Sequence, residues 1–312
     1  MLLLLACSDG ADTASLDTAG DPSREFAAAF DSARLEERVR YLASDELAGR
    51  RAGTAGDALA VTYIADALSA AGFEAPAGGR EQGFVDSEGT SSVNVLGVRW
   101  GADPDVGDEI VVVGAHHDHL GERNGDIFAG ANDDASGVAV LLGLADAFGA
   151  GLAADRTLVL AAWGSEEVNL DGSLAYVEAP PADLPLGDTV FYVNLDMVGT
   201  YDAYEILYAL DAVRGGVVRP IVTAAADRSR LNVDLDELGE LSDSVNFCDA
   251  GVPEVFFYTE DPACYHEPCD TADRLDYGDL SAVAGLVGSV VESLTDGTVE
   301  LAEARAGGCP AG

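Results

Sequence analysis

Positive charge is scarce in this chain of 312 residues. Lys and Arg together number 16, against 56 Asp and Glu, and no lysine occurs at all. The formal net charge at pH 7 is therefore −40. Such an acidic surface disfavours nucleic acid and anionic lipid as partners, because both are polyanions. Solubility, for instance in a salty environment, is the simplest explanation of this charge, and attraction of cationic peptides or metal ions is the alternative.

Long linkers are also missing. The chain is 48% apolar and only 7% aromatic, a length and composition suited to one large domain or two small ones. Apolar periodicity continues from about Leu35 to Leu294 without a Pro-, Gly- or Ser-rich break. The sequence therefore predicts one domain over residues 31–300, followed by a C-terminal tail over residues 301–312.

No apolar run reaches the roughly 20 residues that a membrane-spanning helix needs. The N-terminal run MLLLLAC resembles a bacterial lipoprotein signal in which Cys7 becomes lipidated, although no basic segment precedes it. We expect residues 1–7 to be this signal and residues 8–30 to be an acidic, disordered tether. The protein would then be exported, as a cell-envelope lipoprotein or a secreted protein, and would contact a membrane only through its anchor.

Cysteines are few, and their use fits export. Besides Cys7, four remain and allow three pairings: Cys248, Cys264, Cys269 and Cys309. A bridge between Cys264 and Cys269 would close a tight loop around His266 and leave Cys248 to pair with Cys309. Buried thiols and a cysteine-rich zinc site are the alternatives.

Strand-like and helix-like segments alternate along the chain. Apolar residues at helical spacing predict helices over 35–43, 58–71 and 135–148, and Gly72 should end the second of these. Strands are predicted over 92–99, 109–115, 157–163, 189–196 and 254–259. Uninterrupted apolar runs such as EIVVVGA indicate strands that are buried on both faces. The predicted fold class is α/β, with a mixed, mostly parallel central sheet and helices on both faces.

Acidic and imidazole side chains follow several of the predicted strands. In open α/β sheets, ligands bind outside the carboxyl ends of the strands. The residues at or shortly after such ends are His116, Asp118, Glu166, Glu167, Asp196 and His266. Asp133 instead precedes the helix predicted at 135–148. Imidazole nitrogens and carboxylate oxygens are zinc ligands, so this edge of the sheet is a candidate metal site.

The motifs that carry these residues occur in a characteristic order: GAHHDHLG, GANDDASG, GSEEVNLDGS, YVNLDMVG and CYHEPCDT. In this combination the chain resembles the co-catalytic di-zinc aminopeptidases, a zinc exopeptidase family that includes secreted bacterial leucyl-type aminopeptidases. The resemblance extends from about Arg34 to Glu292. It implies a phosphorylase/hydrolase-like fold, two zinc ions per chain, and peptides with a free N-terminus as substrates. We expect a monomer.

Matching the motifs position by position assigns five metal ligands by resemblance. Asp133 would bridge both ions. By the same resemblance, the peptide bond between Asp133 and Asp134 is expected to be cis. His116 and Asp196 would bind one ion, and Glu167 and His266 the other. Asp118 matches the carboxylate that orients the first histidine. His117 and His119 match no ligand position, so we expect them to be loop side chains.

Glu166 is left without a metal and matches the general base of the family. The implied mechanism is hydrolysis by a water held between two ions, with Glu166 taking its proton. Tyr265 is a candidate for polarising the substrate carbonyl. Phe247 could line an apolar pocket for the substrate side chain, although core packing is the alternative for both aromatics. Where the family usually has an Asp-His pair, Asp243 is followed here by Ser244. This segment often borders the substrate pocket in the family, so the resemblance leaves the substrate specificity open, while the metal ligands are unaffected.

Three other functions compete with the aminopeptidase. A glutaminyl-peptide cyclase shares this fold but typically uses one zinc. Di-zinc deacylases and carboxypeptidases usually carry an inserted dimerisation domain, for which Asp196 and His266 are too close in sequence. A non-catalytic binding module would be expected to lose a ligand or the base, and this sequence retains both.

Overall fold

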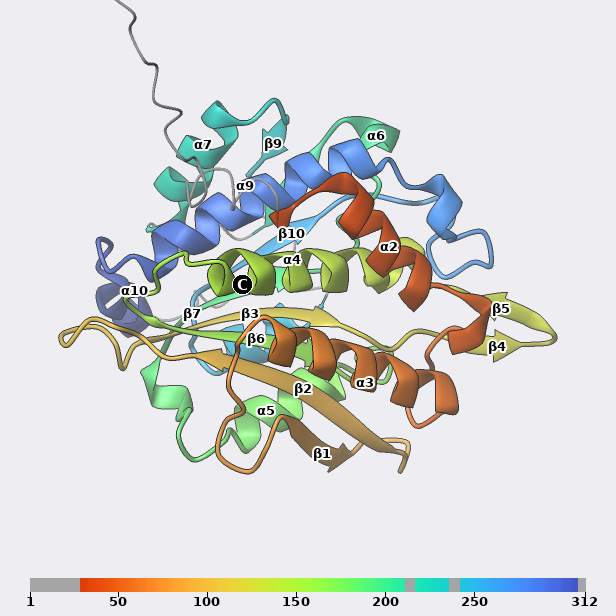
Figure 1. Ribbon diagram of the computed structural model, residues 1–312, viewed down its shortest axis with the longest axis horizontal. Coiled ribbons are helices and arrows are strands. Elements are labelled where there is room, and N and C mark those ends of the chain that lie inside the picture. The colour runs from red at the N-terminus through yellow and green to blue at the C-terminus, as the bar shows by residue number, and fades with distance from the viewer. Residues whose placement is uncertain (1–28, 211–216, 236–241, 308–312) are drawn as a thin grey trace, which may run out of the picture.

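A mixed sheet forms the centre of the molecule. The computed structural model describes residues 29–210, 217–235 and 242–307. Eight strands pair in the order β1-β2-β6-β3-β7-β10-β8-β9, and helices cover both faces (Figure 1). The strands are β1 (Glu81–Val85), β2 (Ser91–Arg99), β3 (Ile110–His116), β6 (Thr157–Trp163), β7 (Thr189–Leu195), β8 (Leu207–Leu210), β9 (Val233–Asp234) and β10 (Glu254–Tyr258). The predicted α/β fold class is confirmed.

The middle of the sheet is parallel. Strands β6, β3, β7 and β10 run in one direction, whereas β2 is antiparallel to β6 and β8 is antiparallel to β10. Every residue of β3, β6 and β7 is buried, as their uninterrupted apolar sequences predict. Because parallel strands end at the same edge, the polar residues that follow them are brought together there.

The larger core lies between the sheet and four long helices. These are α2 (Ser32–Leu42), α3 (Ala55–Ala70), α4 (Gly137–Gly149) and α9 (Tyr277–Thr295). Asp31 caps α2 by accepting from two backbone amides, and Gly72, with φ +82°, follows the end of α3 as predicted. Helix α4 is buried on nearly all sides, which explains why its sequence is apolar around its whole circumference.

The smaller core lies on the opposite face, beneath α5 (Asp171–Glu178) and α8 (Ser244–Asp249). It is aromatic, with the side chains of Trp163, Tyr176, Tyr192 and Phe247 packed against one another. The strand residues that face it alternate with those that face the larger core, as the pleat requires. Among them, His116 and Trp163 are the last residues of β3 and β6.

The remaining elements are short. They are the hairpin β4 (Gly121–Arg123) and β5 (Asp126–Phe128), helices α6 (Tyr201–Tyr204), α7 (Val218–Arg228) and α10 (Leu301–Gly307), the turns η1 (Asp45–Leu47), η3 (Leu186–Asp188) and η4 (Ala272–Arg274), and the π-helical turn η2 (Ala131–Ser136).

Two predicted boundaries shift. The expected tether reached residue 30, but Ala29 and Phe30 are 4% and 2% exposed and belong to the larger core, with the Phe30 ring against Gly143 of α4. The expected tail begins instead with helix α10, whose Leu301 is fully buried. Residues 1–28 and 308–312, with Cys7 and Cys309, lie outside the described residues.

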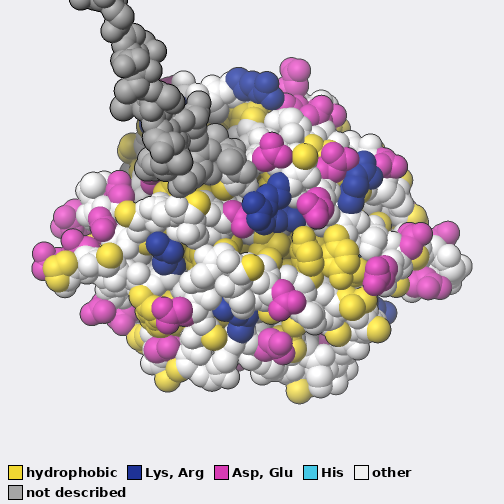
Figure 2. Space-filling view, viewed as in Figure 1, with side chains coloured by type: hydrophobic (Ala, Val, Ile, Leu, Met, Phe, Trp, Pro, Cys, Tyr) yellow, Lys and Arg dark blue, Asp and Glu magenta, His cyan; other side chains and the backbone are white. Residues whose placement is uncertain are grey.

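The acidic composition is visible on the surface. On the face shown in Figure 2, Asp and Glu side chains are spread widely, with few arginines among them. Several of the described arginines are paired with acids, as in the 2.7 Å contact between Arg40 and Asp273. Within the described residues, no helix is both long enough and apolar enough to cross a membrane.

Candidate metal centre

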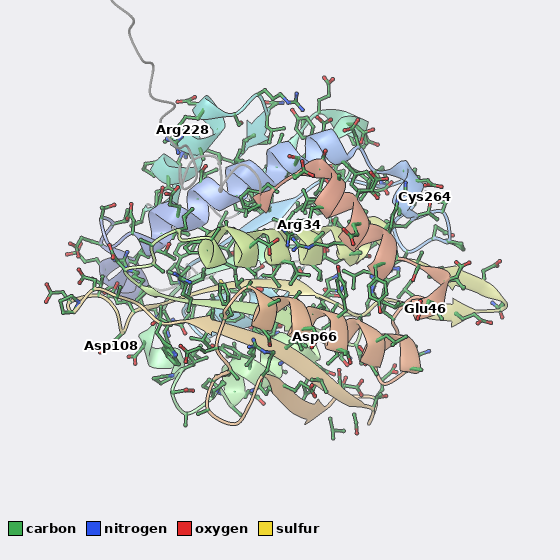
Figure 3. All side chains as sticks on the ribbon, in the orientation of Figure 1. Arg34, Glu46, Asp66, Asp108, Arg228 and Cys264 are labelled. Carbon is green, nitrogen blue, oxygen red and sulfur yellow. A yellow bond between two sulfur atoms is a disulfide. The ribbon has the colours of Figure 1, made fainter. Side chains whose placement is uncertain are left out.

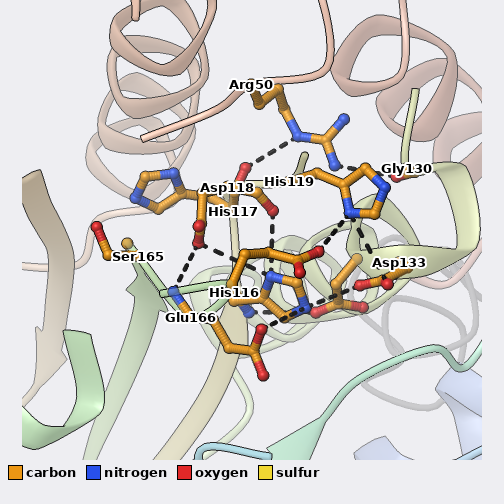
Figure 4. A network of polar contacts seen from close by, with 12 residues as sticks. Arg50, His116, His117, Asp118, His119, Gly130, Asp133, Ser165 and Glu166 are labelled. Atoms are coloured by element: carbon orange, nitrogen blue, oxygen red, sulfur yellow. Dashed lines mark hydrogen bonds and ion pairs between the residues drawn. The ribbon is translucent and has the colours of Figure 1, made fainter. Parts of the chain in front are cut away.

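The polar residues predicted at the strand ends do meet at one edge of the sheet. His116 ends β3, Asp196 follows β7, and Glu166 and Glu167 lie in the turn that follows β6. The loop after β10 brings in His266, while Asp133 projects from η2, ahead of α4 (Figure 4). Two groups of these side chains could each hold an ion.

The inner group consists of His116, Asp133 and Asp196. The Nε2 atom of His116 lies 3.1 Å from Asp133 Oδ1 and 3.5 Å from Asp196 Oδ1. Both His116 Nε2 and Asp196 Oδ1 are buried without a hydrogen-bond partner among the described residues. The opposite ring nitrogen, His116 Nδ1, lies 3.1 Å from the carbonyl oxygen of Asp118, which fixes the ring and leaves Nε2 free to bind a metal.

The outer group consists of His119, Asp133 and Glu167, which together could hold an ion, and of His266, which contacts the latter two. The Nε2 atom of His266 lies 3.3 Å from Asp133 Oδ2 and 3.1 Å from Glu167 Oε2. Asp133 therefore turns one carboxylate oxygen toward each group. His266 is held in a left-handed conformation, with φ +55°, within the loop that the Cys264–Cys269 disulfide closes.

The disulfide prediction is confirmed for that pair. The bridge joins residues five positions apart and encloses Tyr265 and His266. Figure 3 shows Cys264 on the same side of the molecule as β4 and β5. Cys248 is also disulfide-bonded, but Cys309, its predicted partner, lies outside the described residues.

Asp133 is fixed by its surroundings. The Asp270 carboxylate accepts the backbone amides of Asn132 and Asp133 at 2.8 and 3.0 Å. The Asp134 carboxylate accepts from the backbone amides of Gly137 in α4, His116 in β3 and Met197 in the loop after β7. The Asp133–Asp134 peptide is cis, as expected. Sequence reasoning gave no role to Asp134 or Asp270, although Asp270 stands in the CYHEPCDT motif.

Arg50 is a third positioning residue that the sequence did not reveal. Its guanidinium is 1% exposed and donates to four backbone carbonyls, those of Leu42, His117, Ala129 and Gly130. Figure 4 shows it above His119 and next to Gly130. Burial lowers the pKa of Arg50, while the nearby carboxylates oppose this shift.

Asp118 differs from its predicted role. Its carboxylate Oδ1 lies 3.9 Å from His116 Nδ1, too far for a hydrogen bond, and its backbone carbonyl makes the contact instead. The carboxylate accepts the backbone amide of Glu166 at 3.0 Å. Asp118 thus joins the His116 ring to the Glu166 backbone, and burial raises its pKa to about 6.

The two adjacent glutamates occupy opposite electrostatic environments. Burial raises the pKa of Glu166 well above its usual value. Burial also acts on Glu167, but contacts with His119 and His266 outweigh it and hold the pKa of Glu167 at about 2. The two neighbouring carboxyl groups therefore differ in how readily they accept a proton.

Burial and neighbouring charges also have opposite effects on the pKa values of the candidate metal ligands. Burial would lower the pKa of His116, but Glu166 and Asp196 raise it well above its usual value. Burial would raise the pKa of Asp133, but the surrounding imidazoles lower it. Carboxylates outnumber cationic groups here, and a buried surplus of negative charge calls for bound cations.

The histidines expected to be loop side chains are in fact buried. His117 contacts Asp57 Oδ1 through Nδ1 at 3.2 Å and the carbonyl of Val93 through Nε2 at 3.0 Å, so it ties the loop to α3 and β2. His119 Nδ1 lies 2.7 Å from Glu167 Oε1. A side chain on Gly130 would collide with the His119 ring, so this glycine makes room for it.

A cavity of about 250 Å³ opens beside both groups. It is lined by Asp133, Glu166, Glu167, Asp196, Met197, Phe256, Tyr258, Tyr265 and His266. Tyr265, the candidate for polarising the substrate carbonyl, lines this cavity and stacks on the His266 ring with centroids 4.0 Å apart. Phe247 does not reach the cavity; it is fully buried in the smaller core, so its predicted contact with substrate is wrong.

Comparison with known proteins identifies the family of this chain. A family model described as Peptidase family M28 matches residues 94–291, well over half of the sequence. The chain belongs to peptidase family M28. This M28 chain is 27% identical over 282 residues to leupeptin-inactivating enzyme 1 of Streptomyces exfoliatus. The matched region covers 84% of this chain and 60% of that protein. It thus spans less than two thirds of that relative.

Solved structures share the fold of this M28 chain. The aminopeptidase from Aneurinibacillus sp. strain AM-1 superposes with a TM-score of 0.70 at 20% identity, covering 86% of this chain and 95% of that one. Glutaminyl cyclase from Porphyromonas gingivalis also gives a TM-score of 0.70, at 19% identity, over 85% and 98% of the two chains. At such identities the likeness establishes the fold and leaves the reaction open.

Proposed function

We propose that this protein is a zinc-dependent aminopeptidase that holds two ions per chain and uses Glu166 as its general base. The observation that carries the proposal is the position of Asp133. Its two carboxylate oxygens face separate histidine nitrogens, His116 Nε2 at 3.1 Å and His266 Nε2 at 3.3 Å. Membership of a peptidase family and the fold shared with an aminopeptidase support it.

The donor set fits zinc. With bonds of about 2.0–2.1 Å, the ligand atoms of a tetrahedral zinc lie about 3.3 Å apart. The separations of His116 Nε2 and His266 Nε2 from the carboxylate oxygens that would share an ion with them range from 3.1 to 3.5 Å. The inner ion would bind His116, Asp133 and Asp196, and the outer ion Asp133, Glu167 and His266. The orphaned His116 Nε2 and Asp196 Oδ1 would then have a partner.

His119 fits better as a positioning residue than as a ligand. Its 2.7 Å separation from Glu167 Oε1 is shorter than the spacing between two ligands of one zinc. Glu167 would turn Oε2 toward the outer ion, together with His266, and leave Oε1 to His119. Outer-shell partners of this kind hold ligating carboxylates in place.

When bound, a pair of zinc ions lowers the pKa of a water and polarises the scissile carbonyl. The carboxylate of Glu166 lines the cavity next to this position and takes the proton from the water, then returns it to the leaving amine. The raised pKa of Glu166 suits a group that must both accept and release a proton. Asp118 holds the backbone of this base through the Glu166 amide.

The cavity favours substrates with a free amine. Its walls carry four carboxylates, from Asp133, Glu166, Glu167 and Asp196, and within the described residues they carry no arginine. A cationic α-amine is therefore attracted, and an acidic side chain is not. Met197, Phe256 and Tyr258 would offer an apolar wall for the first side chain, and Tyr265 would contact the carbonyl through its hydroxyl.

The context of the protein is part of the same proposal. Residues 31–300 act as one domain and a monomer on peptide substrates, without a nucleic-acid partner. The N-terminal Cys7 and the disulfide-bonded cysteines favour export, as a lipoprotein or a secreted protein.

The test pairs two adjacent substitutions. Glu166→Gln should keep two zinc ions per chain but lower kcat on aminoacyl chromogenic substrates by about 10²–10⁴-fold. Glu167→Gln, the matched control, should lose the outer ion. Zinc is counted by elemental analysis. Full activity of Glu166→Gln, or no activity of the wild-type protein on any substrate with a free amine, would contradict the proposal.

The glutaminyl cyclase remains the second candidate because the fold is shared. It predicts one zinc ion per chain and cyclisation of an N-terminal glutamine without release of amino acids. The same zinc count, with mass spectrometry of a glutamine-initiated peptide, separates the two reactions.

A further inference from the structure

A chain of four buried hydrogen bonds leads from the smaller core to Asp196. Trp163 Nε1 donates to Tyr192 OH at 2.9 Å, and this hydroxyl donates to Asn194 Oδ1 at 2.7 Å. Asn194 Nδ2 donates to Ser242 Oγ at 2.9 Å, and Ser242 Oγ donates to Asp196 Oδ2 at 2.8 Å. The side chains from Trp163 to Ser242 are all 0% exposed.

The alternation of side chains along a β-strand explains how these groups come together. Tyr192 and Asn194 alternate along β7, and Asp196, directly after the strand, continues the alternation on the same face of the sheet. Trp163, on β6, is two strands away, because β3 lies between β6 and β7. The two side chains meet above Gly114 of β3, where a Cβ would lie 2.2 Å from the indole nitrogen and 2.4 Å from the hydroxyl. Glycine at 114 is thus what allows the first bond.

The chemistry of the two ends fixes the direction of every bond. An indole N–H can only donate, and an ionised carboxylate can only accept. The Tyr192 hydroxyl, which accepts from Trp163, has its one proton for Asn194 Oδ1. This orients the amide so that its NH₂ faces Ser242, whose proton is then available only to Asp196. Burial raises the pKa of Tyr192, which keeps it a neutral donor.

We propose that Trp163, Tyr192, Asn194 and Ser242 form a relay that positions Asp196 for the inner ion. The relay rests on the proposed function only in taking Asp196 as a ligand. It occupies Oδ2 and so leaves Oδ1, which lies 3.5 Å from His116 Nε2, for the metal. Each member is a positioning residue, because none of the four lines the cavity.

The surroundings keep the relay rigid. Phe247 stacks on Tyr192 with ring centroids 3.8 Å apart and planes within 5°. Polar groups buried in an aromatic core are costly unless all are satisfied, and along this path all are. A core that needed only packing could use phenylalanine at 192 and avoid that cost.

The experiment measures zinc affinity by chelator competition, starting from metal-free protein. Tyr192→Phe should weaken one of the two ions about tenfold, and Ser242→Ala should weaken the same ion by about 10–100-fold. In the double variant, Tyr192→Phe should add nothing, because the path is already cut at Ser242. The matched control is Tyr176→Phe: this hydroxyl lies in the same aromatic cluster, is equally buried and has no partner among the described residues.

Three outcomes decide the question. Wild-type affinity in Tyr192→Phe, or a loss that adds fully to that of Ser242→Ala, overturns the relay while leaving the proposed function intact. Failure of the wild-type protein to bind zinc overturns both. If Tyr192→Phe does not fold, as judged by circular dichroism, Trp163→Phe removes the first donor with an aromatic ring kept. It should weaken the same ion by a smaller factor, and unchanged affinity would contradict the relay.

Discussion

The inner and outer metal groups share Asp133 but are built in different ways. The inner side chains stand at the ends of β3 and β7, where His116 is 1% and Asp196 12% exposed. The outer group depends on a turn and a loop, and its His266 is 37% exposed. Strand ends are positioned by the sheet itself, whereas the loop is held by a disulfide. The same types of donor, imidazole and carboxylate, are therefore held by hydrogen bonding on one side and by a covalent link on the other.

The largest effect is expected where the two groups meet. Asp133→Ala removes one oxygen from each group, so both ions should be lost, and activity should fall by more than the roughly 10–100-fold that loss of an outer-shell partner costs. Elemental analysis of the purified variant checks this. Asp126→Ala, at an exposed position in β5, is the control. An Asp133→Ala protein that keeps one ion at full affinity would show that the groups are independent.

A smaller effect should separate the groups. The Cys264→Ser/Cys269→Ser double variant frees the loop that carries His266 while leaving β3 and β7 untouched. The short loop that the bridge closes predicts a loss of about 2 kcal/mol in the free energy of unfolding. One ion should bind more weakly and the other as before.

Denaturant titration measures the loss of stability, and stepwise zinc titration the two affinities. Equal weakening of both ions would mean that the loop supports the whole centre rather than its outer half.

The difference between the groups also explains what the sequence could predict. The predicted strand over 157–163 coincides with β6, and the other predicted strands agree with β2, β3, β7 and β10 to within a residue or two at each end. Buried parallel strands have uninterrupted apolar sequences, so both the sheet and its carboxyl edge could be read directly. The motifs then supplied the candidates that the structure brings together around Asp133.

The misplaced residues are those whose position depends on side-chain contacts between distant segments. Nothing in the sequence distinguishes Phe247 from an aromatic residue that lines a substrate pocket. Only the structure shows that its ring stacks on Tyr192 in the core. His119 matches no motif position, and only the fold shows that its ring reaches Glu167. Arg50 lies far from the motifs in sequence, and nothing in its local pattern indicates that its guanidinium binds four carbonyls. Hydrophobic periodicity reports which face is buried but not which buried polar atoms meet.

The smallest expected effect is a dependence of stability on pH, with two separate pH windows. In the metal-free protein, burial raises the pKa of Asp118 and Asp270 to about 6 and that of Asp243 to about 7. A folded state with raised carboxyl pKa values binds more protons than the unfolded chain between about pH 4 and 7, so its stability falls as pH rises through that window.

His266 acts in a second window. Contacts with Asp133 and Glu167 raise its pKa to about 10, so the stability it contributes is complete below about pH 6.5 and is lost as pH rises toward 10. The Tm of metal-free protein should therefore decline in two stages, and His266→Gln should reduce the second stage while Asp243→Asn reduces the first. Zinc should flatten both, because bound cations favour the ionised carboxylates and displace the proton of His266. Parallel Tm profiles with zinc and with chelator would show that these groups do not belong to one metal centre.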